Sequence, residues 1–319
     1  MGLEINQAHV AQYSSNVRML AEETRSPLRP ICEIKGVNGA VFFGDRLTGS
    51  NTVRSTGRHE TNPSTPPRHD RRRGWTVDDK WGAYIDHADE IRSIIDFKGK
   101  YPTLCVNAFN RSETSLIIDA LGGPAYTEVT SDTPGAASSV VTVNNYDAGE
   151  CRLISGSGVL VTAGSNHTDT TATALTIAKL ALCGELLDKA GFTPDNGYPQ
   201  SRYFIANAYN KWQLLQTTEA KSLDYNSRRA LAEGTIDSFM GFRFIWTEQL
   251  ATDTTETDCI KAFAAVGGAV ALGIGQDISP KMWQDSSHCN EWYCYGFASK
   301  GATRQEGPAV IQINLKAAA

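Results

Sequence analysis

The sequence has no long hydrophobic run. Its longest uncharged, apolar-looking segment covers residues 262–276, and it is too short and too rich in glycine to span a bilayer, which takes about 20 residues. The first ten residues, MGLEINQAHV, lack the apolar stretch of a secretory signal peptide. We therefore expect a soluble protein that does not associate with membranes and is not exported by a signal peptide.

Cysteine usage gives no sign of a disulfide framework. The chain of 319 residues has seven cysteines, an odd number that is scattered along the sequence. We expect reduced, partly buried thiols in a cytosolic setting. The length favours about two domains, or one large domain with insertions. The net charge of −5 argues against a dedicated nucleic-acid-binding protein.

Common catalytic and cofactor motifs are also absent from the sequence. There is no GxxxxGK[ST], GxGxxG after a strand, HExxH, CxxC or GxSxG pattern. His288 and Cys289 with Cys294 match no common zinc spacing, although they would be the best place for an unrecognised active site. We expect no metal, no cofactor and no enzymatic activity, and we keep an enzyme as an alternative.

One stretch lacks the large apolar residues that form a core. Residues 54–74 contain no Ala, Val, Ile, Leu, Met, Phe, Trp, Tyr or Cys, but they contain six arginines against two acidic residues. Such a stretch cannot bury apolar surface of its own. Its arginines could bind phosphates, or they could pair with carboxylates of a neighbouring subunit, which we favour. The residues in or beside it that we expect at a subunit contact are Arg54, Arg58, His59, Arg68, His69, Arg71, Arg72, Arg73 and Trp75.

The segments around this basic stretch have strand and helix patterns. Residues 6–24 place Val10, Tyr13, Val17 and Leu20 on one stripe of an amphipathic helix, which packs on its own domain or forms an arm that docks elsewhere. Residues 31–48 are typical of short strands, and Asn38-Gly39 indicates a two-residue hairpin turn. We expect residues 35–84 to form a long two-stranded excursion with an irregular tip.

The rest of the chain mixes helices and strands without a strict βαβ repeat. We expect a long helix at residues 104–121, ended by two glycines and a proline, and a second helix at residues 171–190, capped by Asp169 and ended by Gly191. Residues 203–206 read as a strand, residues 207–216 as a helix and the Gly- and Phe-rich residues 234–247 as strands. Residues 291–299 and 309–315 should close the chain as two strands joined by a turn. The fold class is therefore α+β.

Several ordered blocks resemble a known family. These are QYSSNVRMLAEE…SPLRP (12–30), TGRHETNPSTPPRHDRRR (56–73), DHADEIRSIID (86–96) and SRYFIANAYNKWQLLQ…DYNSRRALAEGTIDSFMGFRFIWTEQL (201–250), followed by GATR…AVIQINL (301–315). They look like the major capsid proteins of tailed bacteriophages, which have the Hong Kong 97-type capsid fold. The resemblance implies a subunit that forms hexamers and pentamers of an icosahedral shell around double-stranded DNA.

The resemblance also implies a division of the chain. Residues 1–30 would be an N-terminal arm and residues 31–85 an extended loop that lies over the adjacent subunit. Residues 86–124 and 286–319 would form a peripheral domain with a long spine helix, and residues 125–285 mainly an axial domain, with 125–170 as a candidate insertion. Tyr13, Val17 and Leu20 of the arm would join the subunit contacts.

The implied partners are copies of the same chain, a portal protein, scaffolding or decoration proteins, and packaged DNA held without sequence specificity. The protein would be assembled in the host bacterial cytoplasm and reside in the virion capsid. The prototype of this fold cross-links its subunits through a Lys and an Asn, but residues 54–74 contain no Lys, so we expect non-covalent locking. Alternatives are the shell protein of a cellular encapsulin-type compartment and a DNA-binding protein that works through the arginines.

Overall fold

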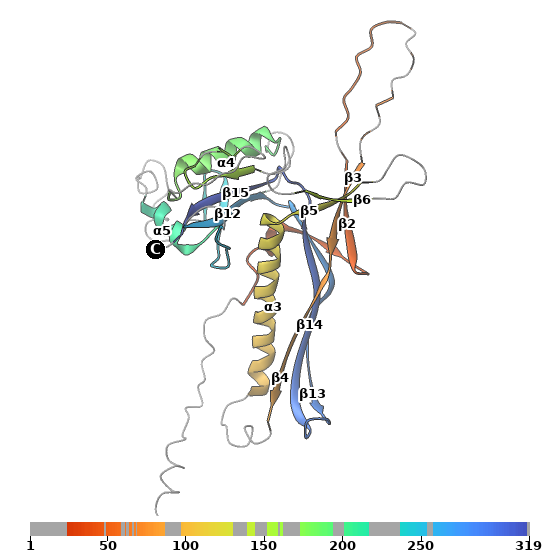
Figure 1. Ribbon diagram of the computed structural model, residues 1–319, viewed down its shortest axis with the longest axis vertical. Helices are drawn as coiled ribbons and strands as arrows, with labels where there is room; N and C mark the ends of the chain where they lie inside the picture. Colours follow the sequence, from red (N-terminus) through yellow and green to blue (C-terminus); the bar gives the residue numbers. More distant parts are fainter. Residues whose placement is uncertain are drawn as a thin grey trace, which may run out of the picture.

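The computed structural model describes residues 24–47, 49–58, 61, 64–65, 67, 69–86, 97–129, 139–143, 152–158, 160–161, 173–193, 201–216, 237–253 and 258–317. The described strands form three sheets, and helices pack on two of them (Figure 1). None of the described helices is both long and apolar enough to cross a membrane.

A seven-stranded sheet forms one end of the molecule. Its strand order is β10-β11-β9-β12-β15-β7-β8. The strands are β7 (Arg152–Ile154), β8 (Leu160–Val161), β9 (Arg202–Ala206), β10 (Ser238–Phe239), β11 (Phe242–Trp246), β12 (Cys259–Val266) and β15 (Val310–Lys316). Helices α4 (Ile177–Lys189) and α5 (Ala208–Gln216) lie with this sheet, and the largest hydrophobic cluster, which includes Leu180, Leu214 and Phe263, joins them.

A second sheet forms an elongated body beside the long helix (Figure 1). Its order is β1-β13-β14-β4, from β1 (Cys32–Gly36), β13 (Val270–Asp285), β14 (Glu291–Arg304) and β4 (Val77–Ile85). Helix α3 (Phe97–Gly122) packs on one face, where Cys105 and Phe109 contact Ala298. The helix was expected at residues 104–121 but begins seven residues earlier. Pro102 lies within its first two turns, where the proline removes only one backbone hydrogen bond.

The third sheet has the order β2-β3-β5-β6 and supports the basic stretch. It comprises β2 (Val41–Leu47), β3 (His69–Trp75), β5 (Ala125–Val129) and β6 (Ser139–Val143). The expected hairpin turn at Asn38-Gly39 is wrong, because β1 pairs in parallel with β13 whereas β2 pairs with β3. The turn residues therefore connect two different sheets, and Val37, Phe42 and Ala271 pack together at this corner.

Several other predictions are confirmed or corrected by the structure. The strand at 203–206 and the helix at 207–216 are present as β9 and α5. Helix α4 is shorter than expected and is capped by the Thr176 hydroxyl, which accepts from the Lys179 N–H, instead of by Asp169. Gly191 follows that helix with φ +90°, as a helix-ending glycine should. The two last strands do not pair, because β14 lies between β13 and β4 and β15 between β12 and β7.

Candidate intersubunit interface

Strand β3 shows that the basic stretch is partly ordered within its own subunit. In place of one returning strand, the excursion expected at residues 35–84 returns in two strands of different sheets, β3 and β4, and β3 begins at His69, so that three consecutive arginines lie in a strand that pairs with β2 and β5. Because successive side chains of a strand point to opposite faces, Arg71 and Arg73 lie on one face and Arg72 on the other. The three arginines therefore have different surroundings.

Arg72 is buried inside the subunit, with 1% of its surface exposed. Its guanidinium donates hydrogen bonds to the Thr127 hydroxyl and to the backbone carbonyl of Gln305. We expected this arginine at a contact between subunits. Instead, its guanidinium makes these hydrogen bonds within its own subunit. A sequence pattern could not show this, because the partners lie 55 and 233 residues away. Arg72 fastens the base of the β2–β3 hairpin to the end of β14.

Arg71 and Arg73 lie on the accessible face of the same hairpin. Arg71 Nε is 2.6 Å from the Asp45 carboxylate, and its guanidinium lies over the Phe43 ring at 5.1 Å from the centroid. Arg73 lies over Trp75 at 5.2 Å, and Trp75 in turn packs edge-on against a tyrosine of β5. These cation–π contacts hold both guanidinium groups beside aromatic rings, with Arg71 exposed and Arg73 half-buried.

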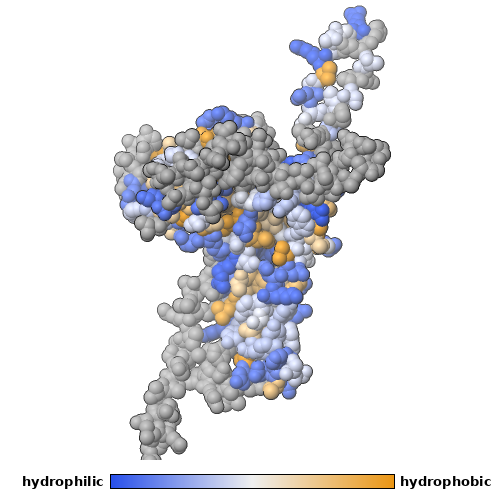
Figure 2. Space-filling view, viewed as in Figure 1, coloured by the Kyte–Doolittle hydropathy of each residue, from blue (hydrophilic) through white to orange (hydrophobic). Residues whose placement is uncertain are grey.

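The remaining expected contact residues are distributed between the projecting loop and undescribed parts of the chain. The described residues between 49 and 67 are all exposed, Arg54 and Arg58 among them, and the loop projects away from the body of the molecule (Figure 1). Its described part is mostly hydrophilic in Figure 2. The side chain of His69 is not described, and His59, Arg68, Tyr13, Val17 and Leu20 lie outside the described residues.

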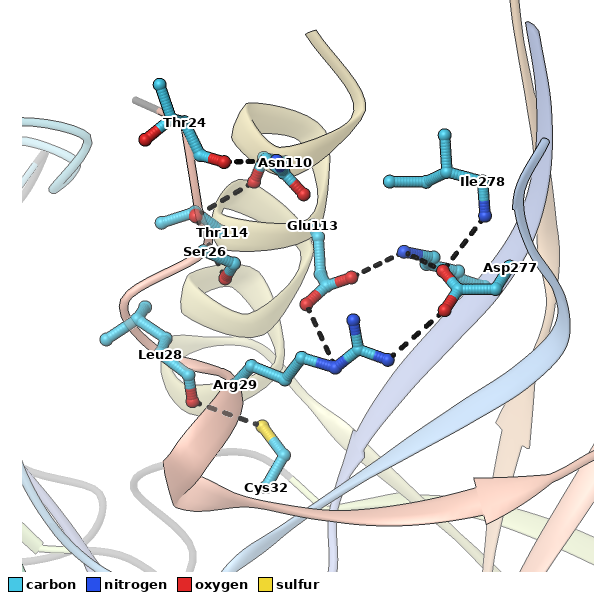
Figure 3. Close-up of polar contacts among 11 residues, drawn as sticks. Thr24, Ser26, Leu28, Arg29, Cys32, Asn110, Glu113, Thr114, Asp277 and Ile278 are labelled. Carbon is cyan, nitrogen blue, oxygen red and sulfur yellow. Dashed lines mark hydrogen bonds and ion pairs between the residues drawn. The ribbon is translucent and has the colours of Figure 1, made fainter. Parts of the chain in front are cut away.

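The base of the N-terminal segment is fastened by a network of charges that the sequence did not reveal (Figure 3). Glu113 of α3 lies between Lys300 of β14 and Arg29, and both cations also contact Asp277 of β13. Glu113 and Lys300 are 1% and 6% exposed, whereas the Asp277 side chain is 55% exposed. Apart from Asp277 and Lys300 in adjacent strands, the residues of this network are more than eighty positions apart in the sequence. A local sequence motif therefore could not predict the network.

Hydrogen bonds continue this attachment toward the N-terminus. The Asn110 side-chain amide donates to the carbonyl of Thr24, and the Thr114 hydroxyl donates to Ser26. Burial and the nearby Glu113 carboxylate raise the pKa of the Cys32 thiol to about 12, so this cysteine remains a neutral thiol at neutral pH. The segment from residue 24 to β1 is therefore tied along the spine helix.

The residues of the enzyme alternative do not converge. Cys294 is buried against Cys105 under α3, whereas His288 and Cys289 lie in the exposed turn between β13 and β14. His288 Nδ1 contacts both the Ser287 hydroxyl, at 3.0 Å, and the Asp285 carboxylate, at 2.9 Å. A serine–histidine–aspartate triad needs these two contacts on different ring nitrogens. Among the described residues, no group of three or more His, Cys, Asp or Glu side chains could hold a metal ion.

Comparisons with known proteins decide the family. The family model described as "Phage capsid protein" matches residues 5–317, which is almost the whole chain. The chain belongs to this phage capsid protein family. A search of curated protein sequences gives no match.

Solved capsid structures show the same fold along their whole length. The capsid asymmetric unit of cyanophage Pam1 is similar with a TM-score of 0.70 and 15% sequence identity, covering 96% of each chain. The capsid of Ralstonia phage GP4 has a TM-score of 0.70 at 10% identity, covering 97% of this chain and 95% of the other. The capsid of a native GTA particle has a TM-score of 0.62 at 12% identity, with 96% and 95% covered. The α+β Hong Kong 97-type capsid fold expected from the sequence is thus confirmed, and this capsid protein belongs to a family of structural proteins, which are not enzymes.

Proposed function

We propose that this capsid protein is the major capsid protein of a tailed phage, and that copies of it form the hexamers and pentamers of an icosahedral shell around double-stranded DNA. The observation that carries the proposal is the family match over residues 5–317, together with capsid structures that align over nearly the entire chain. Because the family match covers residues 5–317, few residues remain outside it that could form a separate domain with another activity.

The shape of the subunit supports assembly with copies of itself. An isolated two-stranded hairpin is marginally stable in water, and the loop between β2 and β3 extends beyond the four-stranded sheet that supports its base (Figure 1). Its described residues are exposed in the single chain. In a closed symmetric assembly, each projecting element can contact the next subunit, and the same contact is repeated around the ring.

We divide the subunit by its sheets. The peripheral domain consists of α3 with β4, β13 and β14, and the axial domain consists of the seven-stranded sheet with α4 and α5. This division places β15 in the axial domain, although residues 286–319 were expected in the peripheral one. Likewise β5 and β6, both within the candidate insertion at 125–170, extend the sheet that carries the loop.

The net charge of −5 fits a container that does not bind its DNA tightly, because strong binding requires many phosphate contacts by Lys and Arg. Portal, scaffolding and decoration proteins are the further partners that we propose. Assembly would take place in the host bacterial cytoplasm, and the mature protein would reside in the virion.

Electron microscopy of the purified recombinant protein tests this function. We expect uniform closed shells from the unsubstituted chain. A variant in which a short Gly-Ser turn replaces residues 51–67 should fold but not form normal shells, because the replacement leaves β2, β3 and buried Arg72 intact while removing the projecting loop. Persistent monomers of the unsubstituted chain would refute the function. Normal shells from the shortened variant would refute the role of the loop.

Two further readouts separate the alternatives. Nuclease-resistant DNA in particles from infected cells supports the phage capsid, whereas an enzyme cargo without DNA supports an encapsulin-type compartment. We also expect mature particles to run as a monomer band on a denaturing gel. A ladder of higher bands would show covalent cross-linking and refute non-covalent locking.

A further inference from the structure

The corner between β1 and β2 presents an asparagine followed by a glycine in an exposed position. Asn38, Gly39 and Ala40 are all exposed, and they connect a strand of the elongated sheet to a strand of the sheet that supports the basic stretch. An Asn-Gly pair usually marks a two-residue hairpin turn, but β1 and β2 do not pair with each other. Strand pairing therefore does not explain this pair of residues.

The corner is held at both ends by hydrogen bonds. The Val37 N–H donates to the Ile274 carbonyl at 2.9 Å, which holds the end of β1 beside β13. On the other side, the Thr76 N–H donates to the Ala40 carbonyl at 3.1 Å, and the Thr76 hydroxyl donates to the Gly39 carbonyl at 3.3 Å. The corner is therefore fixed where it leaves β1 and through the carbonyl groups of its last two residues.

Two other groups of the corner are not held in this way. Among the described residues, none forms a hydrogen bond with the Gly39 N–H or with the side-chain amide of Asn38. A Cβ placed on Gly39 would meet nothing within 4 Å apart from its chain neighbours, so the space around the pair is open. Exposed backbone with few packed neighbours opens locally at little cost in free energy. The Asn38 side chain can therefore turn toward the adjoining backbone nitrogen.

This nitrogen and the Asn38 side chain are the reactants of an intramolecular acyl transfer. The Gly39 nitrogen attacks the side-chain carbonyl carbon of Asn38, a new C–N bond closes a five-membered succinimide ring, and ammonia leaves with the proton of the nitrogen. Water then opens the ring, at the side-chain carbonyl to give aspartate or at the backbone carbonyl to give isoaspartate. The attack gains from the proximity of the two groups, and glycine has no Cβ to obstruct ring closure.

We propose that Asn38 is a site of spontaneous deamidation, with water as the co-reactant, and that its conversion loosens the corner between β1 and β2. Isoaspartate carries the main chain through the side-chain carbonyl, which adds a carbon atom to the backbone. Because the corner is held at both ends, residues 38–40 must take up the added length, and this displaces the carbonyls that Thr76 binds. Both products also add a negative charge to a chain whose net charge is −5.

Two other asparagines of the described chain lack this combination of features. Asn290 is exposed in the turn between β13 and β14, but a glutamate follows it, and the Glu291 N–H donates to the His288 carbonyl at 2.9 Å. Asn314 is buried in β15, and its amide nitrogen donates to the Asp253 carboxylate. These two asparagines are therefore internal references for the reactivity of Asn38.

Peptide mapping of the stored, unassembled subunit by mass spectrometry tests the site. In mildly alkaline buffer, the Asn38 peptide should gain the mass that replaces an amide by a carboxyl group, and it should take up the label from heavy-oxygen water. Conversion should be severalfold slower in neutral buffer, since the attacking nitrogen must lose its proton. The peptides with Asn290 and Asn314 should change at least about tenfold more slowly. The map also separates Asn38 from Asn196-Gly197, which lies outside the described residues.

Gly39→Ala is the matched variant. Its added Cβ meets open space, and Gly39 lacks the positive φ that would strain an alanine, so the variant should fold normally. The same Cβ hinders ring closure, and conversion at Asn38 should fall by about tenfold. Asn38→Gln should show still less conversion, because its longer side chain would have to close a six-membered ring.

Hydrogen exchange measures the effect on the structure. After storage, the Thr76 N–H should exchange severalfold faster in protein that contains isoaspartate, whereas stored Gly39→Ala should keep its protection. No conversion at Asn38, or equal conversion in Gly39→Ala, would overturn the modification. Conversion without faster exchange at Thr76 would overturn the loosening of the corner. These measurements need no assembly, so a failure of the unsubstituted chain to form shells would leave this inference standing.

Discussion

Removal of the Lys300 charge should destabilise the subunit far more than removal of the Asp277 charge, although the two residues contact each other. Lys300→Met keeps most of the length of the side chain but leaves the Glu113 carboxylate, 1% exposed, with Arg29 Nε at 3.9 Å as its remaining cationic contact among the described residues. Breaking a buried ion pair from one side costs about 3–5 kcal/mol. That is a large part of the roughly 5–15 kcal/mol that stabilises a folded domain.

Asp277→Asn is the matched comparison. The Asp277 side chain is 55% exposed, and its contacts to Lys300 at 3.1 Å and to Arg29 at 3.4 Å are screened by water. Solvent-exposed pairs contribute about 0–1 kcal/mol, so this variant should unfold nearly like the unsubstituted chain. The difference in the free energy of unfolding between the two variants therefore depends on how deeply each ion pair is buried, and not on the number of ion pairs.

Guanidinium chloride unfolding of the unassembled subunit measures both changes. The midpoint of Lys300→Met should fall with an unchanged slope, since the variant alters stability and not the surface that unfolding exposes. The double variant Glu113→Leu/Lys300→Met should recover much of the loss, because no buried charge is then left without a partner. Equal losses from Lys300→Met and Asp277→Asn would refute the reasoning.

The effect of pH on the free energy of unfolding of the subunit can also be predicted, because the pKa of Asp277 is lowered in the folded state. Burial of Asp277 opposes its ionisation, but hydrogen bonds from the Ile278 N–H and from Lys300, with the charges of Lys300 and Arg29, hold its pKa below the usual range. A carboxyl whose pKa is lower in the folded state contributes stability above its unfolded pKa of about 3.9, and this contribution is lost as the pH falls toward the folded value. Asp277→Asn should therefore lose less stability than the unsubstituted chain on acidification below about pH 4, and parallel curves would contradict this assignment.

Four further substitutions and one labelling experiment test the packing of the subunit. Arg72→Ala should destabilise the subunit by about 1–3 kcal/mol, because it removes a buried side chain and the donor to the Thr127 hydroxyl, although the Gln305 carbonyl still accepts from Arg46 at 3.0 Å. Arg71→Ala, which breaks an exposed pair, should cost at most about 1 kcal/mol, and similar melting temperatures for the two variants would contradict the burial of Arg72. Gly301→Ala should sharply reduce soluble folded protein, since its Cβ would lie 2.0 Å from the Trp75 carbonyl oxygen, while Gly36→Ala meets nothing within 4 Å and should be tolerated. Among the six described cysteines, maleimide should label Cys289 rapidly in the native protein, and peptide mapping that finds the buried ones labelled first would be inconsistent with the fold.

The sequence predicted the periodic elements well, because their signals are local. The long helix, α5, β9 and the glycine after α4 follow from apolar spacing and from capping and stop residues. The periodicity of residues 260–274 fits a strand and a helix equally well, and they form most of β12 and the start of β13. Both strands are buried there on both faces, so an alternating pattern is absent.

Strand pairing was predicted less well, because it depends on distant residues. Asn38-Gly39 has the local signal of a hairpin, but the parallel pairing of β1 with β13 forces the chain to leave the sheet at that point. Similarly, the run of arginines at 71–73 carried no local sign that its middle member would be buried against Thr127 and Gln305. The overall fold was nevertheless predicted, since the family resemblance supplied the long-range information.

We therefore propose that the basic stretch serves two physical purposes at different positions, anchoring within the subunit and assembly between subunits. Arg71, Arg72 and Arg73 lie in a strand whose contacts are made within the subunit, and they fix the direction in which the loop leaves the body. Residues 54–68 lie beyond that support, and their described members are exposed. Substitutions in the first group should change the unfolding midpoint of the free subunit, whereas those in the second should leave it unchanged and alter only assembly. If a variant at Arg58 lowered the stability of the free subunit as much as Arg72→Ala, this separation of anchoring from assembly would be wrong.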